Sequence, residues 1–118
     1  MKNWGYTFSI QAWLRKQVLT RDWWQCQDCG ETNKIYVHHI LPVRLRPDLR
    51  FDTENLRTVC MPCHMKAHKR IDFLELQMGE DAIKSMAPRE FLKIDDLAMQ
   101  KKIDDARIEE ITRIVFRR

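Results

Sequence analysis

The residues that could do chemistry gather in three short stretches of the 118-residue chain. These stretches are WWQCQDCG (Trp23 to Gly30), IYVHHILP (Ile35 to Pro42) and CMPCHMKAHKR (Cys60 to Arg70), and together they hold all four cysteines and all four histidines. Thiolates and imidazoles are the side chains that zinc and other transition metals prefer as ligands. The clustering therefore predicts metal chemistry.

The four cysteines form two Cys-x-x-Cys pairs, Cys26 with Cys29 and Cys60 with Cys63. Each pair presents two thiolates on one side of a tight turn, and Gly30 suits the backbone of the first turn. Four sulfur ligands complete the closed tetrahedral set of a structural zinc ion, whose binding free energy acts as folding energy. The alternatives are free or disulfide-bonded thiols, and a site in which His64 replaces one cysteine. We expect the four-cysteine zinc site.

Such a zinc ion would tie the two pairs together and close the chain between them into one loop. His38 and His39 lie inside this loop, and His64 and His68 follow it. His64 and His68 are four residues apart on an expected helix, so they share one face. Successive residues of a strand point to opposite sides, so only one of His38 and His39 can face that pair. The other is left beside the metal, where a general base would be.

The elements that must position these residues can be read from hydrophobic spacing and turn residues. Ile10, Trp13, Leu14 and Val18 recur at helical spacing, with Thr7 or Ser9 as a candidate N-cap. The expected order begins with a helix over 8–20, a strand ending at Pro42, an arginine-rich loop over 42–55 and a strand over 56–59. A helix over 64–79 follows, then a short helix over 80–86 and a helical tail from Pro88 with a break near 101–106. We expect one α+β domain over 1–118, made of the N-terminal helix, a core over 23–70 and a helical extension over 71–118.

Charge along the chain favours a polyanionic partner. Residues 38–70 carry seven basic and three acidic side chains, a net +4, whereas residues 71–118 carry nine basic and eleven acidic ones, a net −2. A solvated basic surface is the alternative. The cations that could hold phosphates are Lys66, Lys69, Arg70, Arg44, Arg46 and Arg50. Such contacts fix position without reading base sequence.

No apolar run is long enough to cross a bilayer, and the N-terminal residues lack a secretory pattern. We therefore expect no membrane partner and a cytoplasmic location, where thiols stay reduced.

Three segments in order, His38-His39-Ile40-x-Pro42, then Asn55-Leu56, then Cys63-His64-x-x-x-His68, resemble the HNH endonucleases with a ββα-metal fold. The zinc-knuckle variety of that family carries its cysteines in the same places. The resemblance covers residues 26 to about 70. It implies a small ββα-metal core held by the four-cysteine zinc site, with the N-terminal helix and the C-terminal extension outside it.

The resemblance also implies a role for each residue. His38, His64 and His68 would bind a catalytic divalent cation, His39 would be the general base, and Asn55 would hold the loop that positions His39. The implied reaction is hydrolysis of phosphodiester bonds in duplex DNA, by nicking or cutting, to give 5′-phosphate and 3′-hydroxyl ends. Neutral imidazole suits proton abstraction at neutral pH. Mg²⁺ or Mn²⁺ is expected at the imidazoles, and Ni²⁺, Co²⁺ or Zn²⁺ would also bind there.

Two other functions compete with the nuclease hypothesis. One is a DNA- or protein-binding zinc module without catalysis, which would have no physical reason to keep the full His-Asn-His-His set. The other is an assembly adaptor that works through its tail, for which the sequence offers an amphipathic helix suited to self-association or to a protein partner. Compact members of the resembled family are often phage-encoded and some work beside DNA-packaging machinery. A phage origin would place the protein in the host cytoplasm.

Overall fold

The computed structural model describes residues 11–100, and it divides into two compact units, Met1–Met65 and Lys66–Arg118. Helix α3 (Met61–Met78) runs from the first unit into the second. The candidate N-caps Thr7 and Ser9 and the break expected near 101–106 lie outside the described residues. No helix in the described part of the chain has the length and apolar character needed to span a membrane.

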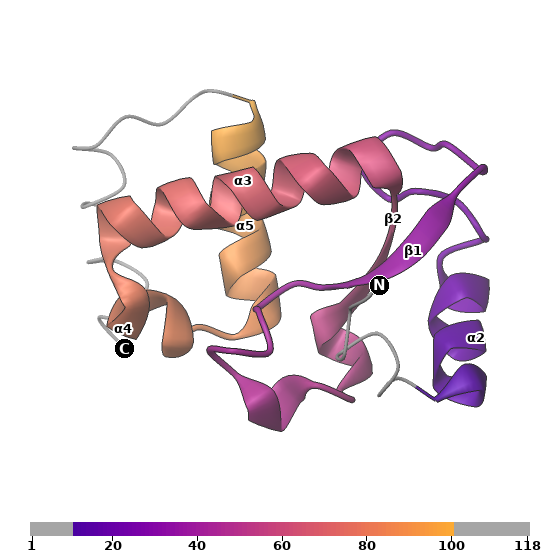
Figure 1. Ribbon diagram of the computed structural model, residues 1–118, viewed down its shortest axis with the longest axis horizontal. Helices are drawn as coiled ribbons and strands as arrows, with labels where there is room; N and C mark the ends of the chain where they lie inside the picture. The colour runs from indigo at the N-terminus through magenta and orange to yellow at the C-terminus, as the bar shows by residue number, and fades with distance from the viewer. Residues whose placement is uncertain (1–10, 101–118) are drawn as a thin grey trace. The chain divides into compact units, whose positions relative to one another are not determined.

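The centre of the first unit is an antiparallel pair of strands, β1 (Ile35–His39) and β2 (Leu56–Cys60). The register places Ile35 opposite Cys60 and His39 opposite Leu56. The long connection between the strands contains two short 3₁₀ helices, η1 (Pro47–Leu49) and η2 (Thr53–Asn55). Because the strands pair antiparallel, Cys60 at the end of β2 lies opposite Ile35 at the start of β1. Figure 1 shows the two strands side by side.

Helix α2 (Ala12–Arg21) packs against these strands. Its buried residues, Leu14, Val18 and Leu19, form one hydrophobic cluster with Val37 of β1 and Leu56 of β2. The expected helix over 8–20 is thus found with its described part at 12–21, and its apolar stripe covers the strand pair. Trp13, which we placed on that stripe, is 59% exposed.

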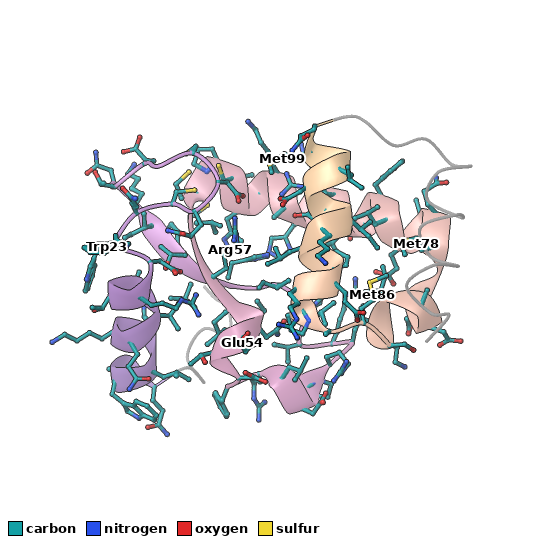
Figure 2. All side chains as sticks on the ribbon, turned by 180° about the vertical axis from the view of Figure 1, so that it is seen from behind. Trp23, Glu54, Arg57, Met78, Met86 and Met99 are labelled. Atoms are coloured by element: carbon teal, nitrogen blue, oxygen red, sulfur yellow. The ribbon has the colours of Figure 1, made fainter. Side chains whose placement is uncertain are left out.

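Helix α2 ends in an unusual turn. The amide of Trp23 donates to the carbonyl of Thr20 at 3.1 Å and the amide of Trp24 donates to that of Leu19 at 2.8 Å, which is the Schellman pattern. The residue after the C-cap is normally glycine because its backbone is left-handed. Here it is Trp23, with φ of 61°, followed by Trp24 with φ of 53°. The ring of Trp23 is 81% exposed and lies at the end of α2 in Figure 2.

A polar clasp fixes this helix end to β2 and its approach. Asp22, at the C-cap of α2, is 6% exposed and accepts a hydrogen bond from the amide of Thr58 at 3.0 Å. Arg21 binds the same carboxylate through two nitrogens, at 2.8 and 2.9 Å. Arg21 also donates to the carbonyls of Thr53 at 2.8 Å and Leu56 at 2.6 Å. The clasp therefore joins residues more than thirty positions apart.

The second unit is helical, with the rest of α3 followed by α4 (Glu80–Lys84) and α5 (Pro88–Met99). Gly79 separates α3 from α4 with φ of 92°, and α5 begins at Pro88, with Glu90 accepting from the amide of Ala87 at 2.9 Å. The buried apolar side chains in this unit are Ala67, Ile71, Leu74, Ile83, Met86, Phe91 and Ile94. Helices combined with one small two-stranded sheet confirm the predicted α+β class with a ββα core.

Candidate functional site

The two Cys-x-x-Cys turns meet in the first unit. The sulfurs of Cys26, Cys29, Cys60 and Cys63 all lie within 4.8 Å of one another, and the structure has no disulfide among them. The sulfurs of Cys29 and Cys60 are 3.6 Å apart. Four sulfurs at about 2.3 Å from one zinc ion stand about 3.8 Å apart at the corners of a tetrahedron. The quartet therefore has the dimensions of a structural zinc site.

The ionisation of these thiols also favours a cation. Burial acts to raise the pKa of Cys26, but hydrogen bonds from the backbone amides of Cys60, Cys29 and Asp28 outweigh it and bring the pKa to about 7. Burial, together with the neighbouring thiols, raises the pKa of Cys63 well above its ordinary value. Thiolates cannot all carry charge this close together unless a cation balances them. A zinc ion would supply that balance.

The first turn is fastened to β2 by contacts besides the cysteines. The amide of Gln27 donates to the carbonyl of Thr58 at 2.9 Å, and that of Gly30 donates to Cys26 at 2.9 Å, with φ of 85° at Gly30. Arg57, labelled in Figure 2, donates from β2 to the carboxylate of Asp28 at 2.8 Å. Hydrogen bonds and an ion pair thus add to the cysteines in joining the first Cys-x-x-Cys turn to β2, which ends at Cys60.

Three of the four imidazoles gather at a second place. Ligand nitrogens of His38, His64 and His68 lie within 4.8 Å of one another, close enough to share one divalent cation. The rings of His38 and His64 are 5.0 Å apart between centroids and meet edge to face, and both side chains are buried, whereas His68 is exposed. His64 and His68 are one turn apart on α3. The exposed member gives the cluster a side open to solvent.

His39 is not part of this cluster and contacts the connection between the strands. It is 5% exposed, and its Nε2 lies 3.0 Å from the carbonyl oxygen of Arg50. A carbonyl oxygen only accepts hydrogen bonds, so Nε2 carries the proton and the lone pair of the neutral ring is on Nδ1. Burial lowers the pKa of His39; the hydrogen bond to Arg50 opposes this, and the positive charge of Arg50 adds to the lowering. The ring is therefore neutral at physiological pH, which a proton acceptor requires.

Asn55 fixes the connection that surrounds His39. Its side chain is fully buried and accepts from the amide of Leu41 at 2.8 Å while donating to the carbonyl of Leu41 at 3.1 Å. It also donates to the carbonyl of Leu49 at 3.4 Å, and its own carbonyl accepts from Ile40 at 2.8 Å. Leu49 immediately precedes the residue whose carbonyl holds His39. One amide side chain thus joins the segment after β1 to the segment that orients the imidazole.

The six candidate phosphate-binding cations differ in their surroundings. Arg70 pairs with Asp95 through two hydrogen bonds, at 2.7 and 3.0 Å, and Arg46 pairs with Asp48 at 2.9 and 3.0 Å. Lys66, Lys69 and Arg44 have exposed side chains, and Arg50 is half-buried. The sequence treats all six alike, because a carboxylate partner 25 residues away, such as Asp95 for Arg70, leaves no local signal.

Sequence reasoning missed the backbone of Arg50 as the partner of His39. A carbonyl group is common to every residue, so no residue type could have marked this contact. It also missed the clasp of Arg21 and Asp22, which holds α2 to the strand that ends in Cys60. Adjacent opposite charges at the end of an expected helix are too common to single out.

Comparisons with known proteins agree with this geometry. A family model described as HNH endonuclease matches residues 26–70, a stretch that contains both cysteine pairs and all four histidines. Anaredoxin from Nostoc sp. (strain PCC 7120) is 38% identical over 56 residues, which cover 47% of this chain and 71% of that protein. No solved structure matches the chain. The HNH domain points to a nuclease that binds nucleic acid, and the cysteine cluster to zinc binding. The chain belongs to the HNH endonuclease family.

Proposed function

We propose that this protein is a metal-dependent DNA endonuclease that hydrolyses phosphodiester bonds in duplex DNA, leaving 5′-phosphate and 3′-hydroxyl ends. The observation that carries the proposal is the division among the imidazoles. His38, His64 and His68 converge on one point, whereas the neighbouring His39 is held apart by the Arg50 carbonyl. Three ligands and one separate base are the parts that hydrolysis with a single metal ion requires.

His39 is the general base in this proposal. Its Nδ1 takes a proton from water as the water oxygen attacks phosphorus. The bond from phosphorus to the 3′ oxygen breaks, and that oxygen takes a proton from solvent to become the 3′-hydroxyl. A divalent cation held by His38, His64 and His68, with Mg²⁺ or Mn²⁺ preferred and Ni²⁺, Co²⁺ or Zn²⁺ tolerated, would supply Lewis-acid stabilisation of the phosphoryl and leaving oxygens. Asn55 acts as a positioning residue, because its hydrogen bonds fix the backbone on both sides of the base.

DNA binding falls to the exposed members of the candidate set, namely Lys66, Lys69 and Arg44. Lys66 and Lys69 lie on the same helix as His64 and His68. Contacts of this kind recognise phosphates, so binding should weaken steeply as salt concentration rises and should show little base preference. The ion pairs of Arg46 and Arg70 make these two guanidinium groups poorer phosphate ligands.

The direct test is nicking of supercoiled plasmid with Mg²⁺ or Mn²⁺ by the wild type and by His39→Ala. General-base catalysis contributes about 10²- to 10⁴-fold, so the variant should lose roughly that factor in rate while keeping its zinc and its fold. Added imidazole should restore part of the lost rate. Equal rates in the two proteins would remove His39 from its assigned role.

A matched variant, His64→Ala, separates the base from the metal ligands. It should also lose cleavage, but unlike His39→Ala it should lose binding of Mn²⁺, measured by the electron paramagnetic resonance signal of the free ion. Added imidazole should not rescue it through proton transfer. If the wild type binds DNA but fails to cut it in the presence of each of these divalent cations, the non-catalytic DNA-binding module becomes the better hypothesis.

A second candidate function is thiol–disulfide exchange. The matching relative is named anaredoxin, Cys29 is exposed, and the pKa of Cys26 is about 7, as in reactive thiols. Exchange requires thiols without bound metal, whereas the quartet has the dimensions of a zinc site. The zinc content of the purified protein therefore separates the two. One zinc ion per chain with unreactive thiols favours the structural site, and a metal-free protein with a reversible disulfide favours exchange.

A further inference from the structure

Arg50 differs from the other arginines around the imidazoles. It follows η1 in the connection between β1 and β2, and its backbone carbonyl holds His39 at 3.0 Å. Its guanidinium lies over the ring of Phe51, 4.9 Å from the centroid. The Nε atom is buried and has no hydrogen-bond partner among the residues that the structure describes. Arg46, in the same connection, has instead bound a carboxylate through two nitrogens.

A buried guanidinium nitrogen without an acceptor is costly, because the group has lost water and gained nothing in exchange. Such a donor is satisfied when a ligand brings the acceptor. The planar fork of arginine matches the oxygens of phosphate and binds them through two parallel hydrogen bonds. The stacked Phe51 ring limits the movement of the guanidinium and keeps it positioned for that partner. An oxyanion is therefore the ligand that this donor is expected to bind.

The location of the Arg50 guanidinium indicates which oxyanion it binds. The residue that carries this guanidinium also holds the ring of His39, because its backbone carbonyl oxygen lies 3.0 Å from Nε2 of that ring. An anion bound by the Arg50 side chain would therefore sit beside the imidazole. In a nuclease the anion beside the base is the phosphodiester under attack.

We propose that the Arg50 guanidinium binds a non-bridging oxygen of the phosphodiester that is cut and holds that group against His39. Arg50 then acts twice, through its carbonyl on the base and through its side chain on the substrate. This deepens the nuclease proposal and rests on it. It also distinguishes Arg50 from the exposed cations, which hold phosphates elsewhere along the DNA.

The test compares two substrates, plasmid DNA and the small diester bis(p-nitrophenyl) phosphate, which offers only the phosphate that is cut. Arg50→Ala should lower kcat/KM for both substrates by about 100-fold, the loss typical of removing one group that stabilises transition-state charge. The backbone carbonyl that holds His39 remains in this variant. The control is Arg15→Ala, which removes an exposed arginine from α2 and should leave cleavage of the small diester unchanged.

Zinc content and the unfolding midpoint of each variant are measured alongside. If Arg50→Ala does not fold, Arg50→Lys, which keeps the charge and loses the planar fork, should still cut the small diester at least several-fold more slowly than the wild type. If a folded Arg50 variant cuts the small diester as fast as the wild type does, this inference alone is overturned, even if the variant cuts DNA more slowly. A wild type that cuts neither substrate with any divalent cation overturns the nuclease proposal and this inference together.

Discussion

Asp22 illustrates how a single carboxylate can hold the core together. Burial acts to raise its pKa, but the hydrogen bonds from Arg21 and Thr58 outweigh burial, and the pKa lies below the ordinary value for aspartate. The unfolded chain therefore takes up a proton at higher pH than the folded chain does. Asp22 contributes stability that is present above the ordinary carboxylate pKa and is lost as pH falls through the folded pKa.

We expect Asp22→Asn to lower the free energy of unfolding at pH 7, with the difference from the wild type shrinking as pH falls into the acid range. Urea unfolding at a series of pH values measures this. The comparison is made between the two proteins at each pH, because acid also protonates the zinc-binding thiols in both. The control is Asp48→Asn, whose ion pair with Arg46 is on the surface and should matter little. A constant difference at all pH values would contradict the assignment.

At the scale of elements, the sequence predicted the helices and strands but few of the side-chain partners. The expected order and the two strands are found, because alternating and helical apolar patterns follow from which face is buried. Helix α3 begins at Met61, three residues before the expected start, because β2 ends at Cys60 and Pro62 fits a first helical turn. The pairing of Arg70 with Asp95 depends on how helices pack and could not be predicted.

The left-handed turn after α2 also escaped prediction, since Trp23 occupies a position where glycine is normal. For an L-residue this conformation costs roughly 1–2 kcal/mol. Trp23→Gly should therefore raise the free energy of unfolding by about 1 kcal/mol, as little packing is lost from an 81% exposed ring. Gln17→Gly, in the exposed middle of α2, should lower it by about 1 kcal/mol. Destabilisation by both changes would mean that the tryptophan ring contributes to folding.

At the scale of the whole molecule, the cysteine quartet holds together the chain segments that carry the imidazoles. Each half of the quartet is attached to the strand pair, and β2 leads directly into the helix of His64 and His68. A zinc ion bound by the quartet would therefore set the positions of the imidazoles without itself taking part in the proposed reaction. That residues 1–118 form a single domain stays a prediction.

We expect Cys60→Ser to lose zinc, the ordered strand pair and DNA cleavage together, because a buried ligand is removed from a closed site. Metal analysis, amide spectra of His38 and His39, and plasmid nicking measure the three losses. Treating the wild type with a strong zinc chelator serves as the control and should give the same state. Cleavage that continues after zinc is gone would contradict the structural role of the quartet.

Helix α3 begins beside the sulfurs and carries Cys63, His64 and His68 within two turns. The proposed ligands for two different ions thus lie on one helix, so we expect that filling either site would restrict the other to its binding arrangement. Thermodynamic reciprocity then requires that each ion raise the affinity of the other by the same factor. In the His39→Ala protein, Mn²⁺ should accordingly increase the chelator concentration needed to remove zinc. If the proposed nuclease is correct, zinc starvation would weaken the binding of its second metal as well.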